Sequence, residues 1–589
     1  MILILAEKPK AAFKIANYLG NGKIFTRKLK NLKYFEFYRD GKRFVCVSAL
    51  GHLFKLDSKN KKWIYPDFDV KWFPSYKEIG KRKLKNYLKA LEILGKNAKD
   101  IIIATDYDVE GDVIGFNILR FVFKRANAKR MKFSALTKFE IENSFRNLMS
   151  SLNFGQVFAG LARHYLDFYW GVNLTRALSL SVRNFVKKRI MISAGRVQSP
   201  TLYLVYKREK EIENFVPKIF WIIKAIFEKN GKKFEGSLKD GKIFEKEKAL
   251  KIFEECKKES YGKVVRVDVE RKKVLRPVPF DLTSLQREAY KYFGFSPSKT
   301  LKIAEDLYLD GLISYPRTSS QKIPPSINIK KIILSLSQIP SYSKISKEII
   351  KEGINLRQGK KVDPAHPAIH PTGLIPKNLS KEKMLIYDLI VRRFLASCYK
   401  DAIKIQTNVL IKVSSYLFEA SGSFFEKEGW YKIYSFVKPE IKILPSLKEG
   451  EKIKIEKINL IKDKTKPPSR YNQGKLLEEM EKRKLGTKGT RSRILDILYK
   501  RKYLEGRKSI RITNLGKALV KTLEEFVPEV LSENLTRKFE EEMEEIMKRN
   551  KSIEEVLEEA KSKLKEILEK IKKNEKKIGK KLLASMKSL

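Results

Sequence analysis

The sequence predicts a multidomain protein that combines α/β and α+β parts. Its 589 residues are more than one hydrophobic core usually organises. Two short apolar runs, MILILAE at residue 1 and KDIIIATD at residue 99, each lead into a helical pattern, which indicates a small α/β sheet. From residue 219 to about 275 polar and apolar residues instead alternate between glycine and lysine turns, as in antiparallel strands.

The rest of the chain divides by the same patterns. Helical periodicity returns around the middle, strand patterns resume near residue 401, and helices follow. We expect an α/β unit at 1–140, a helical part at 141–218 and strands at 219–280. A second helical part should follow at 281–400, then strands again at 401–440 and a final helical part at 441–589. Near the end an apolar seam with spacing 4-3-4-3-4 predicts a long helix that braces a neighbour: Ile553, Leu557, Ala560, Leu564, Ile567 and Ile571.

The charge points to a polyanionic partner. Lysine and arginine exceed aspartate and glutamate by 56, which would destabilise a compact protein unless nucleic acid neutralised the excess. A lysine-rich surface of the thermophile kind is the alternative, but such surfaces usually balance lysine with glutamate. The 42% hydrophobic content excludes global disorder.

The cysteines and apolar runs bear on location. The three cysteines lie far apart and never as CxxC, which excludes a zinc ribbon or a disulfide framework and fits a reducing compartment. The first apolar run is too short for a signal peptide, and no window is long enough for a membrane span. We therefore expect a cytoplasmic, nucleoid-associated protein without a membrane partner.

An acidic cluster follows the second predicted strand. Asp106, Asp108 and Glu110 alternate in ATDYDVEGD, so an extended strand end would place all three on one side. Carboxylates this close resist joint ionisation unless a divalent cation joins them, and hard oxygen ligands favour Mg²⁺. Glu7 and Lys8 end the other strand and could meet the cluster, with Lys8 as a proton donor. The alternatives are a solvated acidic loop and a surface ion pair.

These motifs resemble a known family. LAEKP with TDYDVEGD resembles the Toprim domain, whose metal ligands would be Glu7, Asp106, Asp108 and Glu110. SAGRVQSPTLYLV, LYLDGLISYPRTSS and AHPAIHPTG resemble motifs of type IA DNA topoisomerases, and the similarity runs to about Gly516. It implies a Rossmann-like Toprim domain at 1–140, a DNA-binding groove at 141–218 and 441–589 with a C-terminal brace and basic tail, and a gate arch at 219–280 and 401–440. With a tyrosine domain at 281–400 these would form a toroid with a central hole.

The stretch SYPRT carries the expected chemistry. Tyr315 can attack phosphorus and store the bond energy as a phosphodiester, and the resemblance implies a link to the 5′ end of a broken strand. Pro316 restricts Tyr315 to extended conformations. Arg317 lies two residues further on and can stabilise the phosphoryl oxygens. A tyrosine packed at a proline turn is the structural alternative. The resemblance also implies a catalytic role for His366.

Further residues are expected to bind the strand. Small residues in SAGRVQSP allow close approach of DNA, and GTKGTR offers free amides at a helix N-terminus, where Thr490 is also a candidate N-cap. The sequence departs from the family's groove motif at His164 and Phe168, and Val109 replaces an arginine that is common in the family. Phe168 could instead stack on a base. The expected DNA-binding residues are Arg163, Asp167, Ser193, Arg196, Gln198, Thr318, His370, Thr490 and Arg491.

The resemblance implies an isomerase that acts as a monomer on single-stranded and negatively supercoiled DNA, with Mg²⁺ and without ATP; the sequence has no GxxxxGK[ST] loop. The LAEKP start and the lack of zinc ribbons resemble the archaeal topoisomerase III branch, which implies decatenation or unlinking of single-strand junctions. The alternatives are the topoisomerase half of a split reverse gyrase with a helicase partner, a Toprim nuclease or primase, and an architectural DNA-binding protein.

Overall fold

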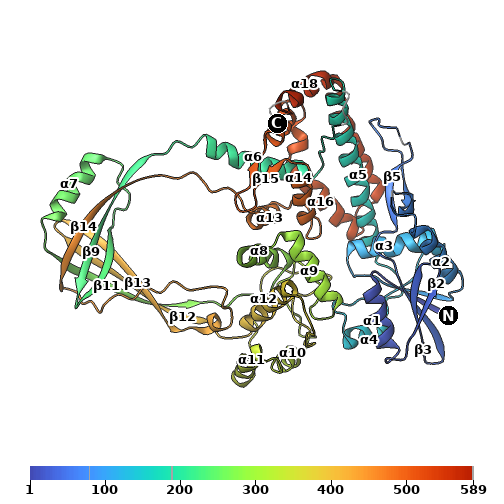
Figure 1. Cartoon of the computed structure of the whole chain (residues 1–589), viewed down its shortest axis with the longest axis horizontal. Helices are drawn as coiled ribbons and strands as arrows, with labels where there is room; N and C mark the ends of the chain where they lie inside the picture. Colours follow the sequence, from blue (N-terminus) through green and yellow to red (C-terminus); the bar gives the residue numbers. More distant parts are fainter. Residues whose placement is uncertain (61, 79, 187–189, 587–589) are drawn as a thin grey trace.

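The computed structural model describes residues 1–60, 62–78, 80–186 and 190–586. Positions 61, 79, 187–189 and 587–589, which fall within the predicted segments, lie outside the described residues. The chain forms a ring: a β-rich arch on one side is joined to helical parts that lead to an α/β unit on the other (Figure 1). This is the predicted toroid of α/β, helical and strand parts.

The α/β unit is built on a six-stranded sheet with the order β2-β3-β4-β1-β7-β8. β1 pairs in parallel with β4 and with β7, whereas β2, β3 and β4 are antiparallel. The strands are β1 (Ile2–Ala6), β2 (Phe25–Leu29), β3 (Leu32–Arg39), β4 (Lys42–Ser48), β7 (Asp100–Ala104) and β8 (Lys129–Arg130). A separate hairpin consists of β5 (Phe54–Ser58) and β6 (Val70–Pro74).

Helices cover both faces of this sheet, so its central strands are apolar throughout. Leu3 and Leu5 pack with α2 (Leu84–Lys96) and α3 (Val109–Ile118), while Ile4 and Ala6 pack with α1 (Pro9–Leu19) and α4 (Lys138–Arg146). A π-helical turn, η2 (Leu119–Phe123), extends α3. The burial of both faces explains why the strands appear as continuous apolar runs in the sequence.

A long central helix, α5 (Phe154–Arg183), organises the groove-forming part. The C-terminal helices α16 (Glu533–Met547), α17 (Ile553–Lys573) and α18 (Glu575–Met586) pack along it (Figure 1). Most of the predicted seam residues on α17 belong to the same core as α5. The remaining elements here are α6 (Gln198–Glu213), α13 (Gln473–Lys482), α14 (Arg491–Lys500), β15 (Leu504–Glu505), β16 (Arg511–Ile512) and α15 (Asn514–Phe526).

The arch is a closed antiparallel barrel with the order β10-β13-β12-β11-β14-β9. Its elements are β9 (Ile219–Lys229), β10 (Lys232–Leu238), α7 (Lys246–Lys257), β11 (Tyr261–Val274), β12 (Ala402–Val413), β13 (Tyr416–Lys427) and β14 (Lys452–Lys464). The predicted boundary at residue 440, after which the chain would belong to the helical groove, is wrong for β14, because β14 pairs with β9 over most of its length. Barrel closure, a long-range contact, keeps the chain in the arch to residue 464.

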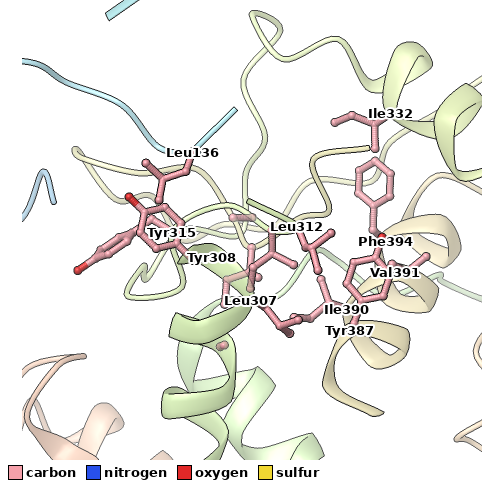
Figure 2. Packing of buried hydrophobic residues seen from close by; sticks show 14 of the residues in the cluster. Leu136, Leu307, Tyr308, Leu312, Tyr315, Ile332, Tyr387, Ile390, Val391 and Phe394 are labelled. Carbon is pink, nitrogen blue, oxygen red and sulfur yellow. The ribbon is translucent and has the colours of Figure 1, made fainter. Parts of the chain in front are cut away.

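The segment 281–400 is helical and follows the order α8 (Leu282–Phe293), α9 (Pro297–Leu309), α10 (Ile329–Leu336), α11 (Pro340–Glu352) and α12 (Lys381–Ser397). Its core is continuous with the α1 face of the sheet, so the two units share one apolar cluster. Figure 2 shows part of this cluster, with Tyr308 and Tyr315 at one edge. In the described residues, no helix has both the length and the apolar character of a membrane span.

Candidate active site

The site begins where two parallel strands end. β1 and β7 lie in register, with Ala6 opposite Ala104, so Glu7 and Lys8 meet the acidic segment at one edge of the sheet. Lys8 Nζ lies 3.0 Å from Glu7 Oε1. Burial alone would lower the pKa of Lys8, but the charges of Glu7 and Asp106 raise it above its ordinary value. Lys8 is therefore a protonated donor beside the acids.

The acidic segment is not an extended strand, so our reason for grouping its three carboxylates is wrong. β7 ends at Ala104 and α3 begins at Val109, which places Glu110 in the first helical turn. Asp108 is the N-cap, and its Oδ1 accepts a hydrogen bond of 2.8 Å from the amide of Gly111. Capping supplies an acceptor for an otherwise unpaired amide and fixes the Asp108 side chain.

A buried arginine holds the turn from behind. Arg130 is fully buried and donates to the carbonyl oxygens of Thr105 and Asp106 at 2.6 and 2.8 Å. Its Nε also donates to Asp112 at 2.9 Å. Burial nevertheless raises the pKa of Asp112 to about 6, because Arg130 only partly offsets the loss of hydration. A Cβ at Gly111 would overlap the Asp106 carbonyl oxygen, so the turn requires glycine.

Tyr315 reaches this turn from the loop after α9. Its backbone amide donates to the carbonyl of Ser134 at 2.7 Å, and its hydroxyl donates to Asp108 Oδ2 at 2.6 Å. Tyr308, on α9, donates its hydroxyl to Asp106 Oδ1 at 3.0 Å. The two rings meet edge to face with centroids 5.1 Å apart. Each phenol is thus paired with one carboxylate.

These groups are deeply buried and electrostatically unbalanced. Tyr315 is only 2% exposed, and burial together with the charges of Asp108 and Asp106 raises its pKa well above its ordinary value. Burial, Glu7 and Asp108 likewise raise the pKa of Asp106. The positive charges of Lys8 and Arg317 do not fully balance these carboxylates. The carboxylates offer hard oxygen ligands, so the residues fit a divalent cation such as Mg²⁺.

Arg317 lies beside the tyrosine with unused hydrogen-bonding capacity. Its Nη2 pairs with Glu305 at 2.5 Å, but its buried Nε has no partner among the residues that the structure describes. Burial alone would lower the pKa of Arg317, yet its interactions with Tyr315 and with the carboxylates of Glu305 and Asp108 raise it. The GTKGTR loop lies next to Arg317. A Cβ added at Gly489 of this loop would lie 3.9 Å from Arg317 Cδ. A phosphate oxygen would satisfy this free donor.

The two histidines of AHPAIHPTG occupy different places. The ring of His366 lies 4.4 Å from that of Tyr315, and its Nδ1 is 3.0 Å from Ser134 Oγ. His370 is buried against Phe394, and its Nδ1 contacts the Pro371 carbonyl at 2.8 Å. Burial lowers the pKa of each to about 4, so both are neutral at neutral pH. His366 belongs to the site, whereas His370 is a core residue in this state.

An ion pair that no sequence pattern predicts, Asp363 with Lys488, joins the three loops around Tyr315. Asp363 accepts from the amide and hydroxyl of Ser319, at 3.0 Å each, and from the amide of Ala365 at 3.0 Å. Lys488 of the GTKGTR loop forms an ion pair with the same carboxylate. Burial alone would raise the pKa of Asp363, but Lys488 and the backbone donors lower it to about 2.

Glu110 faces away from the tyrosines. Its carboxylate pairs with Arg163 and contacts the Nε2 atoms of His52 and His164 at 2.8 and 3.2 Å. Burial alone would raise the pKa of Glu110, but Arg163 and the two imidazoles hold it well below its ordinary value. We expected Glu110 to lie with Asp106 and Asp108 as a further metal ligand. In this state it does not, because its carboxylate faces Arg163 and the two histidines. His52 came from no motif that we singled out.

Several expected DNA contacts are buried and paired here. Arg196 binds Asp167 at 3.0 Å and Glu540 at 2.7 Å, and Gln198 donates to Ser193 Oγ at 2.9 Å. Thr318 donates to the His366 carbonyl at 3.2 Å. These side chains therefore rigidify the loops around the site, and only a rearrangement would free them for DNA.

The GTKGTR loop also differs from expectation. Thr490 makes no side-chain cap of α14; its Oγ1 instead accepts from the amide of Thr487 at 2.9 Å. Arg491 is largely buried, donates to the Leu485 carbonyl at 3.3 Å, and has a pKa lowered by that burial. The loop turns at Gly486, whose φ is +68°. Its lysine and glycine, rather than Thr490 and Arg491, touch the site.

Comparisons with known proteins agree with this architecture. Residues 2–136 match the family described as Toprim domain, and residues 151–558 match the family described as DNA topoisomerase. The second match lies outside the Toprim part, which a Toprim nuclease or primase alone would not explain.

Individual relatives extend the similarity to most of the chain. Proteins called DNA topoisomerase 1 from Pyrococcus horikoshii and Methanocaldococcus jannaschii are 47% and 43% identical, over 90% of this chain and 78% and 69% of theirs. The structure of full-length topoisomerase I from Thermotoga maritima matches with a TM-score of 0.75 at 27% identity, covering 96% of this chain and 90% of that one. The chain therefore belongs to the type IA DNA topoisomerases.

Proposed function

We propose that this isomerase cuts one DNA strand with Tyr315, holds the 5′ end as a phosphotyrosine, passes a second strand and reseals the break. One observation carries the proposal: the Tyr315 hydroxyl donates to Asp108 Oδ2 at 2.6 Å, at the edge of the sheet where Lys8 and Glu7 also lie. A nucleophile, a proton acceptor and a proton donor thus share one site.

The cleavage step balances within these residues. The phenolic oxygen forms a bond to phosphorus as its proton moves to Asp108, and the bond from phosphorus to the 3′ oxygen breaks. Lys8 is charged and donates a proton to the leaving 3′ oxygen, with Glu7 holding its ammonium group. Religation reverses each transfer. The exchange replaces one phosphodiester with another, so it needs no ATP.

Arg317 and His366 support the same step. The free Nε of Arg317 is placed to bind a phosphate oxygen as negative charge grows on it. His366 is neutral and packs against the phenol ring at a tilt, where it orients the ring. Glu7, Asp106 and Asp108 would hold Mg²⁺, which would offset the surplus negative charge and stabilise the phosphate during religation.

DNA must reach a tyrosine that is closed off in this state. The tyrosine domain therefore has to move away from the sheet, and the Asp363–Lys488 ion pair must open with it. A single-stranded stretch can enter such a site more easily than a duplex, which explains a preference for negatively supercoiled DNA. We further propose that supercoil strain drives the cycle, that the enzyme acts as a monomer on the nucleoid, and that it also decatenates or unlinks single-strand junctions.

The test is a denaturing-gel assay with oligonucleotides labelled at either end. We expect a covalent adduct that carries the label of the 3′ fragment only, since that fragment begins with the 5′ phosphate. Tyr315→Phe should bind the single strand and form no adduct. Relaxation should stop when EDTA removes Mg²⁺ and should not respond to ATP. An adduct at the wild-type level in Tyr315→Phe would overturn the proposal, and ATP-driven positive supercoiling with a helicase would favour the split reverse gyrase.

A further inference from the structure

Two histidines and a glutamate meet at a point that the proposed cleavage does not use. His52 lies in the loop between β4 and β5, His164 lies on α5, and Glu110 lies in the first turn of α3. The Nε2 atoms are 2.8 and 3.2 Å from the same carboxylate oxygen, Oε2. One ligand atom from each residue lies within 4.8 Å of the other two.

The two imidazoles are positioned by their packing. Their rings meet edge to face with centroids 5.3 Å apart, and Trp72 packs on His164 at 5.2 Å. The side chains are nevertheless partly open, with 36% of His52, 29% of His164 and 27% of Glu110 exposed. An ion could therefore reach all three and keep solvent in its remaining positions.

The surrounding charges leave room for a cation. Arg163 occupies Oε1 of Glu110, so Oε2 stays available to the histidines. Nearby, Arg196 is shared between Asp167 and Glu540. These pairs contain three carboxylates against two guanidinium groups, so the local balance is negative by one charge. A divalent ion is attracted here despite the adjacent Arg163.

We propose that His52, His164 and Glu110 form a binding site for a divalent transition metal of the Zn²⁺ class. Two imidazoles and one carboxylate with open positions are typical ligands for Zn²⁺, Co²⁺ or Fe²⁺, whereas Mg²⁺ prefers oxygen ligands. The site is therefore chemically distinct from the acids that face Tyr315. A bound ion would link the β4–β5 loop, α3 and α5.

The full-length protein can be titrated with Co²⁺ while its visible ligand-field absorption is recorded. We expect one ion bound through nitrogen and oxygen, millimolar Mg²⁺ to leave it in place, and Zn²⁺ to displace it. His52→Ala and His164→Ala should each weaken binding by at least about tenfold. Both side chains are partly exposed, so the variants should fold, which circular dichroism can verify.

Two matched variants separate this site from other candidates. The double variant Asp106→Asn with Asp108→Asn should keep Co²⁺ binding, because the asparagine at 108 still accepts from the Gly111 amide. His370→Gln, which removes an imidazole elsewhere, should keep it too. The proposal fails if the wild type binds no Co²⁺, if the His52→Ala and His164→Ala variants bind as tightly as the wild type, or if Mg²⁺ displaces the ion. A strong near-ultraviolet thiolate band would assign the ion to a cysteine and would equally overturn it. None of these outcomes depends on cleavage by Tyr315.

Discussion

The acidic motif that contains Asp106 and Glu110 contributes to two regions of this molecule, and the pKa of its carboxyl groups shifts in opposite directions in the two. On the tyrosine side, burial and neighbouring carboxylates raise the pKa of Asp106. On the groove side, burial would raise the pKa of Glu110 too, but Arg163 and two histidines hold it well below its ordinary value. Arg317 only partly offsets the burial of Asp106, whereas Glu110 is paired directly with the guanidinium group of Arg163.

The start of α3 causes the difference. Because the helix begins at Val109, Glu110 leaves the edge of the sheet where Asp106 and Asp108 stay. A buried carboxylate without sufficient positive charge makes the folded protein less stable but ready to bind a cation, as expected of a functional site. A paired carboxylate stabilises the fold. The motif therefore combines a part that faces the reaction, Asp106 and Asp108, with a part that stabilises the fold, Glu110.

The largest expected effect comes from Asp108→Asn. The asparagine keeps an acceptor for the Gly111 amide but cannot take the proton of the Tyr315 hydroxyl. We expect the rate of covalent adduct formation to fall by about 10³-fold, within the range for loss of a general base. Glu110→Gln should lower the same rate by about tenfold or less, because Glu110 does not contact the phenol.

Single-strand affinity is the control for this pair. Asp108→Asn should bind an oligonucleotide at least as well as the wild type, since a buried negative charge is removed. If both substitutions slow adduct formation equally, the two carboxylates act together during cleavage, and the division described above holds only for the closed state.

Local patterns in the sequence were enough to predict much of this architecture. Apolar runs predicted β1 and β7, and family motifs pointed to Tyr315 and the acids, which the structure brings together at Asp108. What the sequence could not reveal depends on contacts between distant segments. Asp363 and Lys488 are 125 residues apart, and neither residue type signals a partner. Tyr308 had a weak signal, since it lies seven residues before Tyr315 in LYLDGLISY.

The fate of Glu110 shows the same limit. Alternating acids fit an extended strand, yet the helical pattern after the second apolar run begins at Val109, and Asp108 is the N-cap of that helix. The pattern of Asp108 followed three residues later by Gly111 was too weak to show that Glu110 lies in the first turn of this helix. The burial of Arg196 likewise depends on Glu540, which approaches from the far end of the chain.

An intermediate effect is expected at the residue that joins the two parts of the motif. In Gly111→Ala the new methyl would overlap the Asp106 carbonyl oxygen, which Arg130 prevents from moving away. We expect a loss of about 2–3 kcal/mol in the free energy of unfolding, as for an overpacked core site. Chemical denaturation measures it.

Gly171→Ala is the matched control, because it also adds a methyl group to a helical glycine but meets no atom within 4 Å. It should stabilise α5 by about 0.5–1 kcal/mol. If Gly111→Ala were equally harmless, the turn that separates Asp106 from Glu110 would be flexible rather than fixed by Arg130.

The smallest effect is a pair of stability changes with opposite signs. At neutral pH without Mg²⁺, Asp106→Asn should raise the free energy of unfolding by about 1 kcal/mol, since it removes a carboxyl group whose ionised form burial disfavours. Glu110→Gln should lower it by about 1 kcal/mol, because Arg163 loses its partner. Both differences should shrink in acid. The raised pKa of Asp106 means that its cost is absent below the ordinary pKa of aspartate and grows as pH rises from there toward the raised value. The lowered pKa of Glu110 means that its benefit is present above the ordinary pKa of glutamate and is lost as pH falls toward the lowered value. Differences of the same sign at neutral pH would show that the two carboxylates share one environment.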